Sequence, residues 1–240
     1  MTPAALAPAP ALPATQAWLT RLNLNLAHRR VQQDLADAAG LHRRVMKLVP
    51  EELGDSPRAG AGVLFRLDTQ HVGPPVLLVQ SRVPVQPERL PAGYAQVTTR
   101  DMAPMLSALR PGLPVRYRLV GNTVRRCGRN STAGAWKQAI ALHGDDAANW
   151  WAEKATVCGL VLHAGTAEPV DALVSWHASP AAPPAAVVKP TTHRIARAAT
   201  LFEGTATVRD AEALREALLH GVGRSKNYGC GLLSLAPAAR

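Results

Sequence analysis

The sequence predicts an α+β protein made of two tandem domains, and two observations carry this prediction. Residues 18–121 have the pattern strand, helix, strand, strand, helix, strand, and a second unit rich in helices and strands follows at 141–240. The chain has 240 residues, of which 47% are hydrophobic. That content supports a packed core and excludes wholesale disorder, and the length suits one large domain or two small ones.

The first unit is defined by the spacing of its apolar side chains. Residues 18–26 alternate apolar and polar side chains, which indicates a half-buried strand. Asp37 is placed to cap a helix that runs to Val49, where Pro50 ends it. The remaining elements are strands at 61–67 and 75–81, a short helix at 101–109 and an alternating strand at 113–121. This order predicts a ferredoxin-like (RRM-like) domain over 17–122.

The second unit predicts another ferredoxin-like domain, at 141–240, after a linker at 123–140. Its expected elements are a helix at 145–155, strands at 157–163, 171–177 and 194–207, a helix at 210–220, a glycine-rich loop at 221–231 and a strand at 231–236. We expect 178–190 to form a mobile hairpin tip. Residues 1–16 contain no charged side chain and several prolines, which favours a disordered tail over a secretory signal.

Cysteine usage and hydropathy exclude several classes of protein. The chain has three cysteines, Cys127, Cys158 and Cys230, and they lie far apart in the sequence. This spacing argues against a zinc module or a disulfide scaffold and suits a reducing cytoplasm. No apolar run approaches the ~20 residues that span a bilayer. Because the acidic residues do not form the carboxylate cluster of a two-metal nuclease, we expect no metal and no cofactor.

The basic residues are distributed unevenly. The chain has 27 Lys and Arg against 17 Asp and Glu, a formal net charge of +10. Four stretches contain no acidic residue, namely 1–33, 102–144, 172–202 and 217–240. Such segregation favours a polyanionic partner, and nucleic acid in particular, over an acidic membrane surface. A solvated basic surface that serves only solubility is the alternative.

The most informative motif is 221–231, Gly-Val-Gly-Arg-Ser-Lys-Asn-Tyr-Gly-Cys-Gly. Its glycines let backbone N–H groups approach a phosphate, and Arg224 and Lys226 add positive charge. The motif is not a P-loop, because it lacks the Gly-Lys-Ser/Thr ending and precedes a strand. A tight turn with no ligand is the alternative, and the interleaved Tyr228 favours binding of a polyanion.

His42 is the candidate general acid or base. Its side chain titrates near neutral pH, and it lies in the basic helix segment Leu-His-Arg-Arg-Val-Met-Lys at 41–47. The surrounding Arg43, Arg44 and Lys47 could neutralise a phosphodiester. The alternative is that His42 is an ordinary surface residue of a basic helix.

These motifs together resemble the CasE family, the CRISPR repeat-processing endoribonucleases of the type I-E Cascade complex. The similarity lies in 18–49, in Val-Arg-Tyr-Arg-Leu-Val-Gly-Asn at 115–122, and in 200–237 with the glycine-rich ending. The resemblance implies a metal-independent cut at the 3′ base of the repeat stem-loop, in which the 2′-hydroxyl attacks the phosphate. It also implies a 2′,3′-cyclic phosphate product, which stays bound when the protein is a Cascade subunit.

The resemblance implies roles for individual residues. His42 falls on the catalytic histidine and Lys47 on a lysine that steadies the phosphate. Further RNA contacts are expected from the basic segments and the glycine-rich loop: Arg43, Arg44, Arg116, Arg118, Arg125, Arg126, Arg129, Arg194, Arg197, Gly223, Arg224, Lys226 and Tyr228. The expected partners are the CRISPR repeat RNA hairpin, or crRNA, and other Cascade subunits, with the free chain monomeric and not membrane-bound.

One position departs from the family. Its members carry a tyrosine three residues before the histidine, where this chain has Ala39. Tyr228 is a possible substitute, and a non-catalytic subunit that only holds the RNA hairpin is the alternative function. A general RRM module is disfavoured because aromatic residues make up 4% of the chain and Tyr117 stands nearly alone on its strand.

Overall fold

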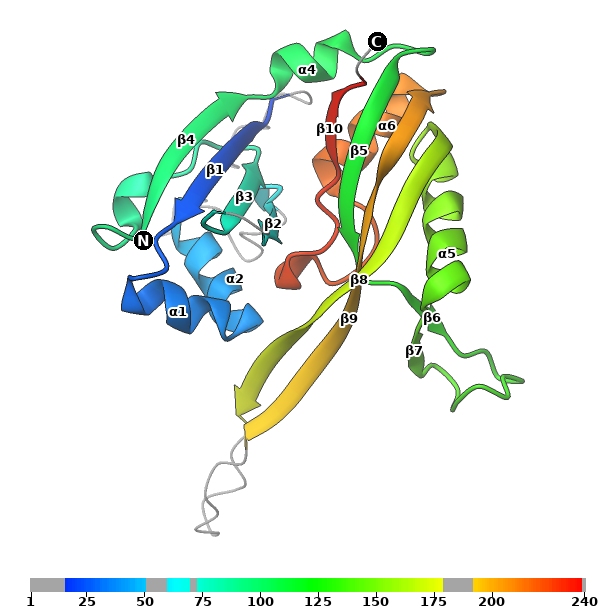
Figure 1. Ribbon diagram of the computed structural model, residues 1–240, viewed down its shortest axis with the longest axis horizontal. Coiled ribbons are helices and arrows are strands. Elements are labelled where there is room, and N and C mark those ends of the chain that lie inside the picture. The colour runs from blue at the N-terminus through cyan, green and yellow to red at the C-terminus, as the bar shows by residue number, and fades with distance from the viewer. Residues whose placement is uncertain (1–15, 51–59, 70–72, 179–191, 239–240) are drawn as a thin grey trace, which may run out of the picture.

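Two four-stranded antiparallel sheets lie side by side, and each has helices on one of its faces (Figure 1). The computed structural model describes residues 16–50, 60–69, 73–178 and 192–238. Within these ranges, no helix is long and apolar enough to cross a membrane. The two sheets confirm the expected α+β class with tandem ferredoxin-like domains.

The first sheet has the strand order β2-β3-β1-β4. Its strands are β1 (Trp18–Leu24), β2 (Leu64–Asp68), β3 (Val76–Ser81) and β4 (Ala95–Asp101). The helices α1 (Arg29–Leu35) and α2 (Ala38–Lys47) follow β1, and the short helix η1 (Pro87–Arg89) lies between β3 and β4. The alternation in β1 sends Leu22 and Leu24 into the same apolar core as Val45 of α2.

The second sheet repeats this order with its own strands, as β10-β5-β9-β8. They are β5 (Pro114–Gly121), β8 (Leu160–Ala178), β9 (Thr192–Val208) and β10 (Ser234–Pro237), joined by α5 (Gly144–Val157) and α6 (Ala211–His220). Three aromatic rings pack in its core, those of Tyr117, Trp151 and Phe202. The Trp151 ring centroid lies 5.4 Å from that of Tyr117 and 5.8 Å from that of Phe202. Tyr117 is therefore a core residue and offers no ring to a nucleotide base.

The strand at 113–121 was expected to complete the first sheet, and the structure places it in the second. The fourth strand of the first sheet is β4, which the sequence did not indicate because most of its residues are exposed and no apolar alternation marks them. The expected helix at 101–109 is α4 (Ala103–Ala108), and it connects the two sheets (Figure 1). The chain passes from one sheet to the other at α4 rather than near 122–140.

The segment 123–140, expected to be a linker, forms most of a small hairpin. Its strands are β6 (Val124–Arg126) and β7 (Ala139–Ala141), which pair antiparallel. Thr123 anchors the base, since its hydroxyl donates to the Leu142 carbonyl at 3.1 Å. Three-residue strands are too short to show a periodic pattern in the sequence.

The strands expected at 157–163 and 171–177 are one long strand, β8, whose pairing with β9 shifts register at Leu162/Ala164 and at Val170/Leu173. The extra residues at these bulges interrupt the alternation, which explains why the sequence suggested two strands. The long β8–β9 hairpin extends beyond both sheets (Figure 1). The expected tail at 1–16 and tip at 178–190 lie almost entirely outside the described residues.

A buried arginine links the two sheets. Arg66 of β2 is 2% exposed and forms a bidentate ion pair with Asp68, at 2.7 and 3.1 Å. Its Nη1 also donates to the carbonyls of Arg118 in β5 and Leu232 at 3.1 and 3.0 Å, and to the Ser234 hydroxyl in β10 at 3.0 Å. One side chain of the first sheet thus satisfies three acceptors of the second.

We expect the substitution Arg66→Met to lower the free energy of unfolding by about 3 kcal/mol or more, because Asp68 keeps a buried charge and three acceptors lose their donor. Urea denaturation followed by circular dichroism measures the change. The matched control is Arg43→Met, since the Arg43 side chain is 68% exposed and its ion pair with Asp37 is worth about 1 kcal/mol or less. Equal stability of the two variants would contradict the role assigned to Arg66.

Candidate functional site

Helix α2 holds His42 at the edge of its buried face. The helix begins after Asp37, whose carboxylate accepts from the backbone N–H groups of Ala39 and Gly40 at 3.1 and 2.9 Å. Leu41 and Val45 are buried, and His42 is half-buried beside them. The imidazole is therefore anchored by the helix yet reachable from solvent.

The imidazole of His42 packs against the ring of Phe65. Phe65 is 1% exposed on β2, and its ring stacks on that of His42 with centroids 6.1 Å apart and planes 17° apart. The glycine-rich loop packs on the same ring, because a Cβ at Gly229 would lie 3.2 Å from it. Gly229 also has φ +88°, so a glycine is required here for both space and conformation.

The glycine-rich loop is closed at its neck by backbone hydrogen bonds. Val222 N–H donates to Gly231 O, and Gly231 N–H donates to Val120 O, both at 2.8 Å. Inside the loop lies the short helix η2 (Lys226–Tyr228), which begins after Ser225. Ser225 has the left-handed conformation with φ 57°, which a serine rarely adopts.

A side-chain clamp holds this conformation. The Ser225 hydroxyl donates to Asn122 Oδ1 at 3.0 Å, and Asn122 Nδ2 donates to the Ala198 carbonyl at 2.6 Å. Asn122 thereby ties the loop to the end of β5 and to β9. The left-handed backbone at Ser225 therefore shapes the main chain between Arg224 and Lys226.

His42 and the loop share one open hollow of about 570 Å³. It is lined by His42, Gly223, Arg224, Ser225, Lys226 and Asn227. An imidazole thus lies in the same hollow as two cationic side chains. This combination can move a proton and stabilise negative charge on a phosphate.

Lys47 does not line this hollow. It lies exposed in the last turn of α2, five residues after His42, which places the two side chains about 140° apart around the helix. Lys226 is the lysine in the hollow. The resemblance to the family pointed to Lys47, whereas the lysine that lines the hollow comes from the glycine-rich loop of the second domain.

Arg44 is committed to packing within the first domain. Its Nε lies 2.7 Å from the Asp34 carboxylate, and its guanidinium covers the Tyr94 ring at 5.3 Å. The Tyr94 hydroxyl donates to the same carboxylate at 3.0 Å. Burial and the Asp34 charge both raise the pKa of Tyr94, so the cluster keeps its hydrogen bond throughout the neutral range. Arg43, by contrast, is exposed beside Asp37.

A basic groove of about 440 Å³ continues from the hollow. The residues that line both are Arg224, Ser225 and Asn227. Arg126 of the β6–β7 hairpin, Arg197 of β9 and Tyr228 complete its functional lining. Tyr228, the suggested substitute for a tyrosine at Ala39, lines this groove and not the hollow around His42.

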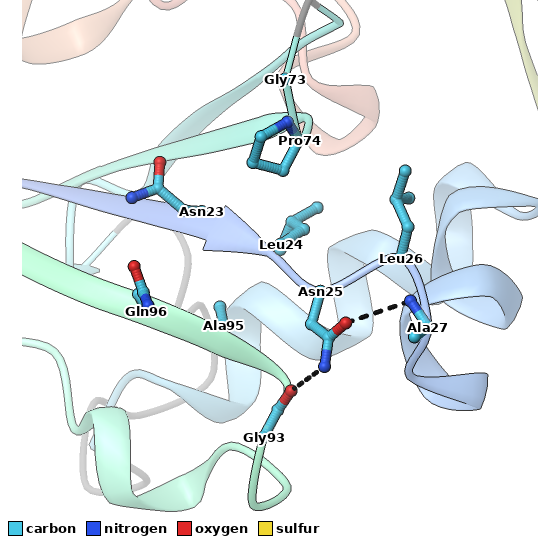
Figure 2. Close-up of a pocket in the computed structure, with 10 residues that line it drawn as sticks. All are labelled: Asn23, Leu24, Asn25, Leu26, Ala27, Gly73, Pro74, Gly93, Ala95 and Gln96. Atoms are coloured by element: carbon cyan, nitrogen blue, oxygen red, sulfur yellow. Dashed lines mark hydrogen bonds between the residues drawn. The ribbon is translucent and has the colours of Figure 1, made fainter.

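A separate hollow of about 660 Å³ lies at the end of β1 (Figure 2). Asn25 spans it, donating to the Gly93 carbonyl at 3.0 Å and accepting from Ala27 N–H at 3.1 Å. None of the described residues that line it is titratable. The hollow contains none of the expected site residues and offers no group for acid–base chemistry.

Comparison with known proteins places the chain in a family. A family model described as CRISPR associated protein matches residues 17–237. The CRISPR-associated endoribonuclease Cse3 of Thermus thermophilus is 31% identical over 234 residues, which cover 92% of this chain and 100% of the relative. The chain belongs to the CRISPR-associated Cse3 (CasE) family. The resemblance seen in the sequence is confirmed.

Solved structures of the CasE family agree with this fold. The structure of Thermus thermophilus Cse3 bound to an RNA representing a pre-cleavage complex has a TM-score of 0.71 and 29% identity, covering 92% of this chain and 100% of that one. A chain of a CRISPR RNA-guided surveillance complex, pre-nicking, has a TM-score of 0.62 and 34% identity, with the same coverage.

The other arginines expected to bind RNA in this CasE family member do not all converge. Arg118 pairs with Glu203 at 3.2 Å and lies 3.7 Å from Asp68, so it belongs to the charged network between the sheets. Arg194 and Arg197 are three residues apart on β9 and so point to opposite faces. The remaining ones are exposed outside the hollow and the groove: Arg116, Arg125 and Arg129.

The sequence did not indicate three residues that line the hollow or pack against His42: Phe65, Ser225 and Asn227. Phe65 lies in a plain apolar run, and nothing in that run marks it as a partner of His42. Ser225 and Asn227 lie inside the glycine-rich loop, in which the charged and aromatic residues were the expected RNA contacts. Their position within the motif was the one available signal.

Proposed function

We propose that this chain cleaves CRISPR repeat RNA at the 3′ base of its stem-loop, without a metal ion, to produce mature crRNA. The observation that carries the proposal is the single hollow in which His42 lies with Arg224 and Lys226. Family membership supports it, since the relative Cse3 is an endoribonuclease that has been solved with RNA.

The reaction needs two proton transfers and a site for negative charge. The ribose 2′-oxygen bonds to phosphorus, the bond from phosphorus to the 5′-oxygen breaks, and the products carry a 2′,3′-cyclic phosphate and a 5′-hydroxyl. A base takes the 2′-hydroxyl proton, and an acid returns a proton to the 5′-oxygen. His42 performs one of these transfers, and Lys226 and Arg224 stabilise the charge that develops on the phosphoryl oxygens.

The product hairpin remains bound, and the protein acts as a subunit of Cascade. A similar chain in a CRISPR RNA-guided surveillance complex supports this part of the proposal. The alternative function is a subunit that holds the hairpin without cutting it. Ala39 favours this alternative, because the family tyrosine that assists proton transfer is missing at that position.

The proposal is tested by incubating the purified protein with its repeat RNA in excess EDTA. We expect a discrete shorter RNA that ends in a cyclic phosphate, identified by mass spectrometry. A shift of the RNA in a native gel without any product would support the non-catalytic alternative. A strict requirement for added Mg²⁺ would refute the metal-independent scheme.

His42→Ala is expected to slow cleavage by about 100-fold or more, the usual contribution of a positioned general acid or base. Affinity for the uncut RNA should stay within about threefold, because phosphate contacts dominate binding. Single-turnover cleavage and filter binding measure the two quantities, and circular dichroism checks that the variant stays folded. Cleavage at the parental rate would remove His42 from the mechanism.

Lys226→Ala and Lys47→Ala form a matched pair. Lys226 lines the hollow and Lys47 does not, so the first substitution should lower the single-turnover rate by about tenfold or more. The second should change it by about twofold or less, as expected for an exposed charge at the helix surface. The opposite ranking would restore Lys47 as the phosphate-steadying residue.

A further inference from the structure

The basic groove beside the hollow has the chemistry of a site for a single nucleotide. Its volume of about 440 Å³ falls within the ~300–1,000 Å³ typical of small-ligand sites. Among the described residues that line it, none is acidic, and Arg126, Arg197 and Arg224 are cationic. An RNA duplex is wider than such a groove and is recognised across its surface, whereas an unpaired nucleotide can enter it.

An aromatic ring and a guanidinium form a platform in the groove. The Arg197 guanidinium carbon lies 5.5 Å from the centre of the Tyr228 ring. Both groups have flat faces on which nucleobases stack. Tyr228 belongs to η2, and its backbone N–H donates to Ser225 O at 2.9 Å, so its main chain is held within the loop that lines the hollow.

The position of Arg197 depends on the irregular pairing of β8 with β9. Val170 pairs with Ala199 and Leu173 pairs with Arg197. The two β8 residues between them therefore lie opposite a single β9 residue, Ala198. The Ala198 carbonyl accepts instead from Asn122 Nδ2 at 2.6 Å. Such a bulge redirects a strand beside a functional site, and here it brings Arg197 to the groove wall.

We propose that this groove binds the unpaired nucleotide immediately downstream of the scissile phosphate, with its base stacked on the Tyr228–Arg197 pair. The inference rests on the proposed function: a cut at the 3′ base of a stem leaves the next nucleotide unpaired. The groove and the His42 hollow share Arg224 and Asn227. A scissile phosphate in the hollow therefore places the following nucleotide at the groove, where the exposed Asn227 amide can meet its polar edge.

The consequence is that the protein distinguishes substrate from product. The downstream nucleotide leaves with the 5′-hydroxyl fragment, so the groove contributes to the affinity for uncut RNA alone. The product hairpin is retained by other contacts.

The test measures binding of three repeat RNAs. The intact probe carries a 2′-deoxy sugar upstream of the cut, which prevents cleavage; the abasic probe also lacks the downstream base; the product hairpin ends at the cut. Wild-type protein should bind the intact probe about tenfold tighter than the abasic probe, as expected for the loss of one stacked base. Equal affinities would overturn the proposal without any substitution in the protein.

Substitutions of Tyr228 test whether the downstream base is bound in the groove. Tyr228→Ala should abolish the difference between the intact and abasic probes, whereas Tyr228→Phe should keep it, and all proteins should bind the product hairpin alike. The control is Arg209→Ala, an exposed arginine whose Nη2 donates to the Thr156 carbonyl at 2.8 Å, away from the groove. An equal loss on intact probe and product hairpin in Tyr228→Ala would show that the groove holds the stem, and would overturn the proposal.

Failure of the proposed function is visible separately. It would appear as no cleavage of the all-ribose repeat RNA by wild-type protein, whereas the binding comparison uses RNA that cannot be cut. Normal cleavage with equal affinity for the intact and abasic probes would refute the nucleotide site and leave the endoribonuclease intact.

Discussion

The bidentate pair of Arg66 with Asp68, and the three acceptors that the same guanidinium satisfies in the second domain, fix how the two sheets meet. The neighbouring residue on β2, Phe65, points to the opposite face and stacks on His42. Two adjacent residues of β2 thus have different partners: Arg66 bonds to the second domain, and Phe65 stacks on the imidazole of His42. The placement of His42 relative to the second domain follows from the alternation of a single strand.

The glycine-rich loop supplies the cationic side chains that α2 does not place in the hollow with His42. The helix offers a histidine, but its own cations are directed elsewhere, because Arg44 is bound to Asp34 and Lys47 lies on another side of the helix. The loop places Arg224 and Lys226 in the same hollow as the imidazole, and the hydrogen bond of Ser225 to Asn122 holds the main chain of the loop to the end of β5.

Local patterns predicted the elements but not their partners. The alternation in β1, the cap at Asp37 and the helix after Asp210 were all readable, because each depends on residues close in sequence. The membership of β5 in the second sheet was not, since a buried alternating strand has the same pattern in either sheet. The ion pair of Arg118 with Glu203 was also not predictable, because this acid comes from a distant strand. The meeting of His42 with Lys226 is likewise a property of the assembled fold.

The open hollow takes its lining from both domains, His42 from the first and the glycine-rich loop from the second. It therefore exists only while the two domains are folded and packed against each other. A change that loosens this packing separates the histidine from the cations without altering any residue that lines the hollow.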